Sequence, residues 1–157
     1  MTEPLELELV VLAGLPGAGK STVARTLYRA GAGRMVLLSS APIRLHNVSS
    51  RAVMGRLAIE ADQALAGGLG VIVDAPSVNP EQRAGWLALA DRRHATPRLV
   101  VVHVALEVAH RRQLRRPRRA RVPLDALERY EAALTALTAH APTEGWATIT
   151  HYQGDSP

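Results

Sequence analysis

The sequence of 157 residues contains no cysteine and no phenylalanine, and it has a single lysine. The lack of cysteine excludes disulfide bonds, iron–sulfur ligation and thiol catalysis. Five aromatic residues, two Trp and three Tyr, leave little side-chain surface for stacking on nucleic-acid bases. The six His residues have no metal-ligand spacing with a carboxylate, so we expect any metal ion to arrive with a ligand.

Long apolar runs and a basic leader are also missing. No stretch reaches 18 apolar residues, and the first residues, MTEPLELELVVL, carry three Glu and no basic residue before the apolar run. A secretory signal has the opposite charge pattern. We therefore expect no membrane span, no interaction with membranes and a cytoplasmic location.

Positive charge is concentrated in one segment. The residues from Glu107 to Arg121 include seven Arg and one Glu, a local charge of +6 within a total of +5. Such a cluster of guanidinium groups indicates a polyanionic ligand, either nucleotide phosphates or a nucleic-acid backbone. The alternative is a solvated helix face in a protein that uses Arg in place of Lys.

Apolar runs alternate with helical patterns along the whole chain. The runs that predict strands cover residues 7–13, 34–39, 70–74, 99–106 and 146–152, and the patterns that predict helices cover 19–29, 49–66, 80–93 and a segment from Pro123 to Leu137. This alternation predicts a single α/β domain over residues 1–157, with a five-stranded parallel sheet between two layers of helices. Ligands of such sheets bind beyond the carboxyl ends of the strands. Neither the order of the strands nor the oligomeric state is readable from the pattern.

The junction of the first strand and first helix matches a phosphate-binding motif. Residues 14–22, GLPGAGKST, fit G-x-x-x-x-G-K-[ST] at every fixed position. The motif predicts nucleoside triphosphate binding by Gly14, Pro16, Gly17, Ala18, Gly19, Lys20, Ser21 and Thr22. Lys20 is expected to reach the terminal phosphates and Ser21 to bind Mg²⁺. Asp74, at the end of the third strand, is expected on the far side of the ion, or else as a cap of the next turn.

Four motifs in this order resemble the small P-loop kinase family (AAA_33-like) that includes the 5′-hydroxyl polynucleotide kinase domain. They are the loop GLPGAGKST, the SSxxIR segment at 39–44, VIVDA with NPEQR at 71–83, and the arginine-rich stretch before Val122-Pro123. The resemblance covers roughly residues 7 to 140. It implies a P-loop NTPase-type three-layer αβα sandwich, an adenylate-kinase-like lid at about 107–122, and transfer of the ATP γ-phosphoryl group to a hydroxyl.

The resemblance also implies roles for single residues. Lys20 and Ser21 match the nucleotide and metal residues, and Asp74 matches the metal-side carboxylate. Arg112 and Arg116, four residues apart on the expected lid helix, match the pair that covers adenine and neutralises the transferring phosphoryl group. Arg44 matches an acceptor-side arginine. Arg83 either binds acceptor phosphate or caps its helix.

One position departs from the family pattern. The aspartate that accepts the hydroxyl proton is expected three residues before Arg44, where this chain has Ala41. Loss of a general base commonly slows a reaction about 10²- to 10⁴-fold. The chain is then a natural relative without transfer activity, a kinase with a relocated base, or a protein carrying a deliberate alanine substitution. Pro76-Ser77 also replaces the usual Thr-Asn, which bears on the acceptor contacts.

Three functions remain open on these residues. The leading one is an ATP- and Mg²⁺-dependent kinase acting on the 5′-OH end of a polynucleotide. A small-molecule kinase shares the loop and the lid, but seven Arg exceed what one triphosphate requires. A nucleotide-binding protein without transfer activity is favoured by Ala41.

Overall fold

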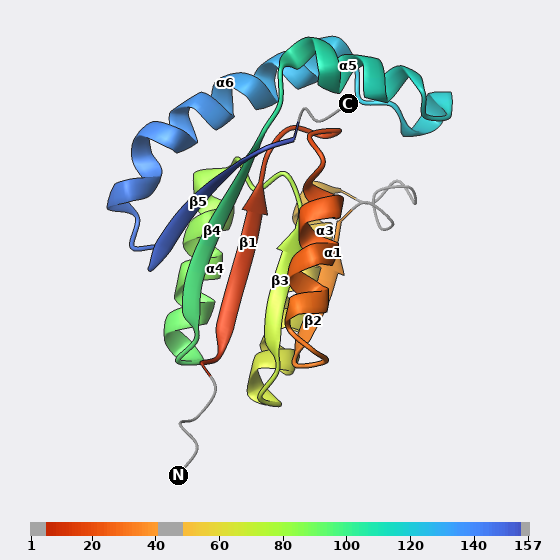
Figure 1. Cartoon of the computed structure of the whole chain (residues 1–157). Coiled ribbons are helices and arrows are strands. Elements are labelled where there is room, and N and C mark those ends of the chain that lie inside the picture. Colours follow the sequence, from red (N-terminus) through yellow and green to blue (C-terminus); the bar gives the residue numbers. More distant parts are fainter. Residues whose placement is uncertain (1–5, 41–48, 155–157) are drawn as a thin grey trace.

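Five parallel strands form one sheet in the computed structural model, which describes residues 6–40 and 49–154. The strands are β1 (Glu8–Ala13), β2 (Met35–Ser39), β3 (Gly70–Asp74), β4 (Thr96–His103) and β5 (Thr148–Gln153). Their order across the sheet is β2-β3-β1-β4-β5, so the first strand lies at the centre (Figure 1). The predicted parallel α/β fold is confirmed, and the order places the ends of β1 and β3 side by side, with Leu12 opposite Asp74.

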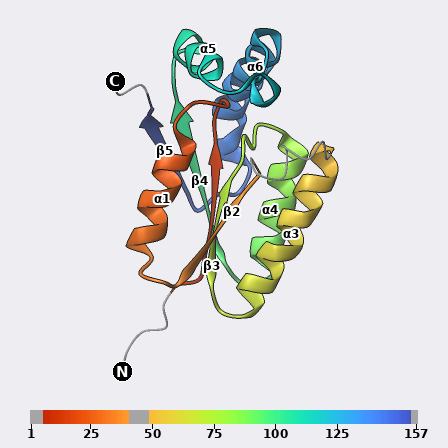
Figure 2. The same cartoon turned by 90° about the vertical axis from the view of Figure 1, so that its right-hand side faces the viewer.

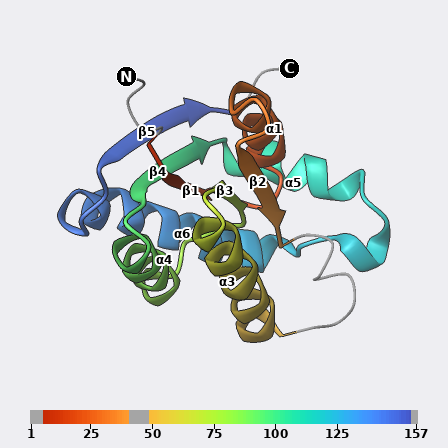
Figure 3. The ribbon, with the colours of Figure 1, turned by 90° about the horizontal axis from the view of Figure 1, so that it is seen from below.

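Helices cover both faces of the sheet. The helices are α1 (Lys20–Ala30), α3 (Ser50–Ala66), α4 (Pro80–Arg92), α5 (Leu106–Leu114) and α6 (Leu124–His140), with 3₁₀ turns η1 (Arg118–Ala120) and η2 (Ala141–Thr143). Figure 2 shows α1 on one face and α3 and α4 on the other, and Figure 3 places α6 on the side of α3 and α4. This layering explains why β1 and β3 read as unbroken apolar runs, because both of their faces are buried.

Helix boundaries follow the local signals that the sequence carries. The Asn79 side chain accepts hydrogen bonds from the backbone N–H groups of Glu81 and Gln82, and Pro80 takes the first helical position of α4. In α3 the predicted four-residue repeat is the buried face, with Val53, Leu57, Ala61 and Leu65 all 3% exposed or less. The apolar spacing therefore identifies the side of α3 that packs on the sheet.

The fourth and fifth strands differ from their predicted bounds. β4 begins at Thr96 and not at Leu99, because Thr96 pairs with Glu8 of β1 and its N–H donates to the Leu7 carbonyl oxygen. Its end is also earlier, since Leu106 already begins α5. β5 begins at Thr148, two residues after the predicted start. The polar Thr-Pro-Arg start of β4 hides its strand character, which comes from pairing with β1 and not from apolar pattern.

None of the helices in residues 6–40 and 49–154 combines the length and the apolar character needed to cross a lipid bilayer.

Candidate functional site

The loop between β1 and α1 has a backbone that requires glycine. Gly19, the residue before α1, has φ of 95°, and no side chain caps the helix there. Gly17 has φ of 89°, and a Cβ at this position would lie 3.2 Å from Gln113 Nε2 and 3.3 Å from the Ala109 carbonyl oxygen. The close packing and the uncapped helix N-terminus together make a loop suited to an anionic group.

A cationic, a hydroxyl and a carboxylate side chain lie at this loop: Lys20, Ser21 and Asp74. Lys20 is 8% exposed, and its Nζ donates to the carbonyl oxygens of Gly14 at 3.1 Å and Leu15 at 2.8 Å. The Ser21 hydroxyl, in the first turn of α1, donates to Oδ2 of Asp74, the last residue of β3, at 2.7 Å. A hydroxyl beside a carboxylate is the oxygen donor set that Mg²⁺ prefers, so these two residues fit the predicted metal role.

The loop forms one wall of a cavity of about 820 Å³. The lining residues are Pro16, Gly17, Gly19–Val23, Ser39, Ser40, Asp74–Pro76, Arg112, Arg116, Arg119–Val122, Gln153 and Gly154. The predicted nucleotide residues Gly14 and Ala18 build the loop without lining the cavity. The Gly14 N–H donates to the Pro76 carbonyl oxygen, and the Ala18 N–H donates to that of Leu15.

The arginine segment, residues 107–121, lies above the carboxyl ends of the strands (Figure 1). Arg112 and Arg116 both line the cavity, but only Arg112 lies on the expected lid helix, because α5 ends at Leu114. The carbonyl oxygens of Leu114 and Arg116 accept from Arg121 Nη2 at 2.9 Å and Nε at 2.8 Å. Pro117 disfavours helical geometry at the residue before it, so the carbonyl oxygens of Leu114 and Arg116 have no helical N–H partner. Arg121 supplies the hydrogen bonds that the helix does not.

Arg112 ties three distant parts of the chain together. Its Nη1 donates to the Gly17 carbonyl oxygen at 2.7 Å, and its Nη2 donates to that of Gly154 at 2.8 Å. Gly154 follows β5 and packs directly on the Ala18 carbonyl oxygen, where a Cβ would have no room. Its N–H donates to the His103 carbonyl oxygen at 2.6 Å, so the end of β5 forms part of the cavity wall.

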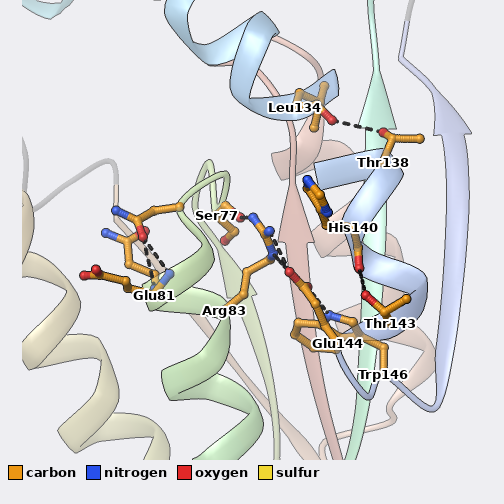
Figure 4. Close-up of polar contacts among 11 residues, drawn as sticks. Ser77, Glu81, Arg83, Leu134, Thr138, His140, Thr143, Glu144 and Trp146 are labelled. Carbon is orange, nitrogen blue, oxygen red and sulfur yellow. Dashed lines mark hydrogen bonds and ion pairs between the residues drawn. The ribbon is translucent and has the colours of Figure 1, made fainter. Parts of the chain in front are cut away.

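Arg83, a predicted acceptor residue, is placed away from this cavity. It is 1% exposed, and its guanidinium donates to Glu144 through Nε at 3.0 Å and Nη2 at 2.8 Å (Figure 4). Its Nη1 donates to the Ser77 carbonyl oxygen at 3.2 Å. Three of the five guanidinium N–H groups donate to protein groups, and the side chain does not line the cavity in which the acceptor was expected.

The Arg83 pair has consequences for Glu144 and for the cavity. Hydrogen bonds from Arg83 and then Trp146 hold the pKa of Glu144 below its ordinary value. Ser77, which Arg83 holds, has φ of 54° and follows Asp74, Ala75 and Pro76 of the cavity wall. Arg83 thus holds the backbone three residues after Asp74 through its hydrogen bond to the Ser77 carbonyl oxygen, without lining the cavity itself.

Other predicted residues fall outside the described part, and some cavity residues were not predicted. Ala41 and Arg44 lie in residues 41–48, outside the described residues. Sequence reasoning missed Gln113, a buried residue next to the cavity, which is 1% exposed and whose Oε1 accepts from the N–H of the cavity-lining Val122 at 3.0 Å. It also missed Gly154. No pattern marks either residue, because their roles arise from contacts between segments distant in sequence.

Solved structures of three kinds share this fold. Kti12 of Chaetomium thermophilum, in complex with ADP-AlF3, is 20% identical with a TM-score of 0.72, over 95% of this chain and 90% of that one. A chain of the Pnkp1/Rnl/Hen1 RNA repair complex is 21% identical with a TM-score of 0.72, over 85% of this chain and 46% of that one. A gluconokinase from Sinorhizobium meliloti 1021 is 15% identical with a TM-score of 0.66, over 96% of this chain and 84% of that one.

At the level of sequence, no curated protein matches the chain. A family model does match, over residues 9–137, a range that runs from β1 through the arginine segment into α6. It is the model of the AAA_33 family, described as an AAA domain. The match covers the phosphate loop, Asp74 and the cavity-lining arginines, and the chain therefore belongs to the AAA_33 family of P-loop proteins.

Proposed function

We propose that this chain binds ATP with Mg²⁺ in the 820 Å³ cavity and transfers the γ-phosphoryl group to a hydroxyl. The observation that carries the proposal is the set of side chains that line this cavity. Lys20 and the Ser21–Asp74 pair line it together with Arg112, Arg116 and Arg119. A loose phosphoryl-transfer state spreads negative charge over the γ-phosphate oxygens, and cations around it stabilise it.

Each group has a defined task in this proposal. Lys20 leaves the carbonyl oxygens of Gly14 and Leu15 to contact the terminal phosphates. Ser21 and Asp74 would hold Mg²⁺, which neutralises phosphate charge when bound. Residues 107–122 act as a lid on a single domain of residues 1–157, with Arg112 and Arg116 contacting the nucleotide. The ADP-AlF3 bound to Kti12, similar in fold over 95% of this chain, supports the nucleotide assignment.

The acceptor that we favour is the 5′-OH end of a polynucleotide. Its hydroxyl oxygen forms a bond to the γ-phosphorus, the bond from that phosphorus to the bridging oxygen breaks, and ADP leaves. The number of cavity arginines exceeds the need of one triphosphate, and the similarity to a chain of an RNA repair complex agrees with a nucleic-acid acceptor.

The hydroxyl proton is the weak point of the reaction. Of the described residues that line the cavity, Asp74 alone has a carboxylate, and it already accepts from Ser21. Ala41 occupies the position of the expected base. Transfer is therefore expected to be slow, because Asp74 cannot serve fully as both metal ligand and proton acceptor.

Labelled ATP and short oligonucleotides with 5′-OH ends test this function. We expect slow label transfer by the parent chain and a transfer rate about 10²-fold or more higher with Ala41→Asp. With Lys20→Ala we expect no label transfer. Transfer to a small sugar but to no oligonucleotide would identify a small-molecule kinase, the class of the similar gluconokinase. Tight ATP binding without transfer to any hydroxyl, even with Ala41→Asp, would identify a nucleotide-binding protein without kinase activity, the second candidate that Ala41 favours.

A further inference from the structure

The arginine segment differs from the other arginines in its partners. Six arginines elsewhere form ion pairs with carboxylates: Arg56, Arg83, Arg92, Arg93, Arg98 and Arg129. Within residues 6–40 and 49–154, none of the seven arginines of the segment does so. Arg112 and Arg121 bond backbone carbonyls, which leave their charge uncompensated.

These seven arginines divide into two sets. Arg112, Arg116, Arg119 and Arg121 line the cavity. Arg111, Arg115 and Arg118, here called the outer arginines, are exposed and do not line it. Each outer arginine directly precedes a cavity-lining one, so their Cα atoms are about 3.8 Å apart along the chain. Successive side chains of a helix do not face each other, so only a ligand with repeated negative charges that extends beyond the cavity can contact both sets.

We propose that the outer arginines bind backbone phosphates of a nucleic-acid strand whose end occupies the cavity. The inference rests on the proposed function for the identity of the acceptor, and it extends the site beyond the reacting end. A mononucleotide or a sugar places its charge inside the cavity and leaves the outer arginines uncompensated. A strand carries one phosphate per nucleotide and continues past the cavity rim.

The shape of the segment favours a strand over a flat anionic surface. The positive charges extend from arginines that line the cavity to arginines of the same segment that do not, and a membrane or a flat protein face does not enter the cavity. The segment is also held in shape, since Gln113 Oε1 accepts from the Val122 N–H and Arg121 bonds two carbonyls at the end of α5. A backbone held in this way keeps the starting points of the arginine side chains fixed, which lowers the entropic cost of binding phosphates.

A triple variant with a matched control tests the surface. In Arg111→Gln/Arg115→Gln/Arg118→Gln the outer arginines lose their charge while the cavity stays unchanged. The control, Arg25→Gln/Arg29→Gln/Arg34→Gln, removes three exposed arginines on or just after α1, which also form no carboxylate pair among the described residues. Both variants lose three positive charges, so any difference in their oligonucleotide affinity is due to where the replaced arginines lie.

Fluorescence anisotropy with 5′-OH and 5′-phosphorylated oligonucleotides of about a dozen nucleotides gives the affinity without needing transfer. We expect the outer variant to bind them about 10- to 100-fold more weakly at low salt, with the slope of log affinity against log salt reduced by about 2. Affinity for ATP and for a dinucleotide should stay within about twofold of the parent, and the control variant should match the parent.

Equal weakening in the outer and control variants would overturn the inference, as would unchanged oligonucleotide binding in the outer variant. Binding of anionic lipid vesicles that depends on the outer arginines, with no oligonucleotide binding, would also overturn it. Failure of the proposed function gives a different result: the strand then binds through the outer arginines, but no label is transferred from ATP.

Discussion

Lys20, the single lysine of the chain, is the residue at which the proposed phosphate contact can be tested most directly. We expect Lys20→Ala to weaken ATP binding about 10- to 100-fold, because a charge-assisted contact to the terminal phosphates is lost. Isothermal titration calorimetry measures the affinity, and circular dichroism checks that the fold persists. Arg25→Ala, an exposed arginine on α1, serves as the control for a lost positive charge. An unchanged ATP affinity in Lys20→Ala would contradict the assignment of this loop as the phosphate-binding site.

Gly154 is a second single residue with a testable role. In Gly154→Ala the new Cβ meets the Ala18 carbonyl oxygen, so either the phosphate loop or the end of β5 must shift. We expect ATP affinity to fall about 10-fold, since small displacements of a positioned loop are costly.

Gly55→Ala is the matched control for Gly154→Ala. A Cβ at Gly55, on the exposed side of α3, meets nothing within 4 Å. That variant should gain about 0.5–1 kcal/mol of stability in urea unfolding and keep its ATP affinity. The two results together distinguish the general effect of replacing a glycine from the specific effect of a steric clash with the phosphate loop.

The pairing of β4 with β5 contains a titrating contact between two elements. His103 Nε2 lies 2.8 Å from His151 Nδ1, and the stacked rings have centroids 5.0 Å apart. This hydrogen bond needs one nitrogen that carries a proton and one that does not. Burial, and then the charge of His151, lowers the pKa of His103 below its ordinary value of 6.5.

This lowered pKa predicts an acid-sensitive strand. The unfolded chain binds the proton more tightly, so the contribution of His103 is fully present above about pH 6.5 and decreases as the pH falls below it. We expect His103→Gln to show a weaker loss of thermal stability between neutral and mildly acidic pH than the parent chain. His110→Gln, on α5, is the control. The same pH dependence in His103→Gln and in the parent would contradict the assignment.

At the scale of the whole molecule, the partly buried pair of Arg83 and Glu144 connects segments that are distant in the sequence. The pair joins α4 to the connection between η2 and β5, and Arg83 also bonds the backbone of Ser77, directly after the cavity-lining Pro76. Arg83→Met leaves Glu144 without its partner, and we expect a loss of about 3 kcal/mol in the free energy of unfolding.

Urea unfolding checks this loss against two further variants. Arg83→Met/Glu144→Leu should recover part of it, because no charge is then left without a partner. Arg56→Ala breaks an ion pair whose side chains are 68% and 42% exposed and should change stability by less than about 0.5 kcal/mol. Equal effects of Arg83→Met and Arg56→Ala would show that burial of the pair does not matter for stability.

Much of the fold and of the phosphate site is readable from local sequence. The glycines, Lys20 and Ser21 occupy fixed positions between a strand and a helix, and their geometry depends on a few neighbouring residues. The four-residue repeat of α3 and Pro80 at the start of α4 are local signals of the same kind. Such signals are reliable because backbone geometry and the burial of one helix face act over a few residues.

The alternation of strands and helices, the phosphate loop and the clustering of arginines can all be predicted from the sequence, because each depends on residues close together in the chain. The strand order, the end of α5 at Leu114, the partner of Arg83 and the place of Gly154 against the loop are visible only in the folded protein. Arg83 and Glu144 are 61 residues apart, and Arg112 and Gly17 are 95 apart. Contacts at such separations arise from packing of whole elements, and no local pattern records them.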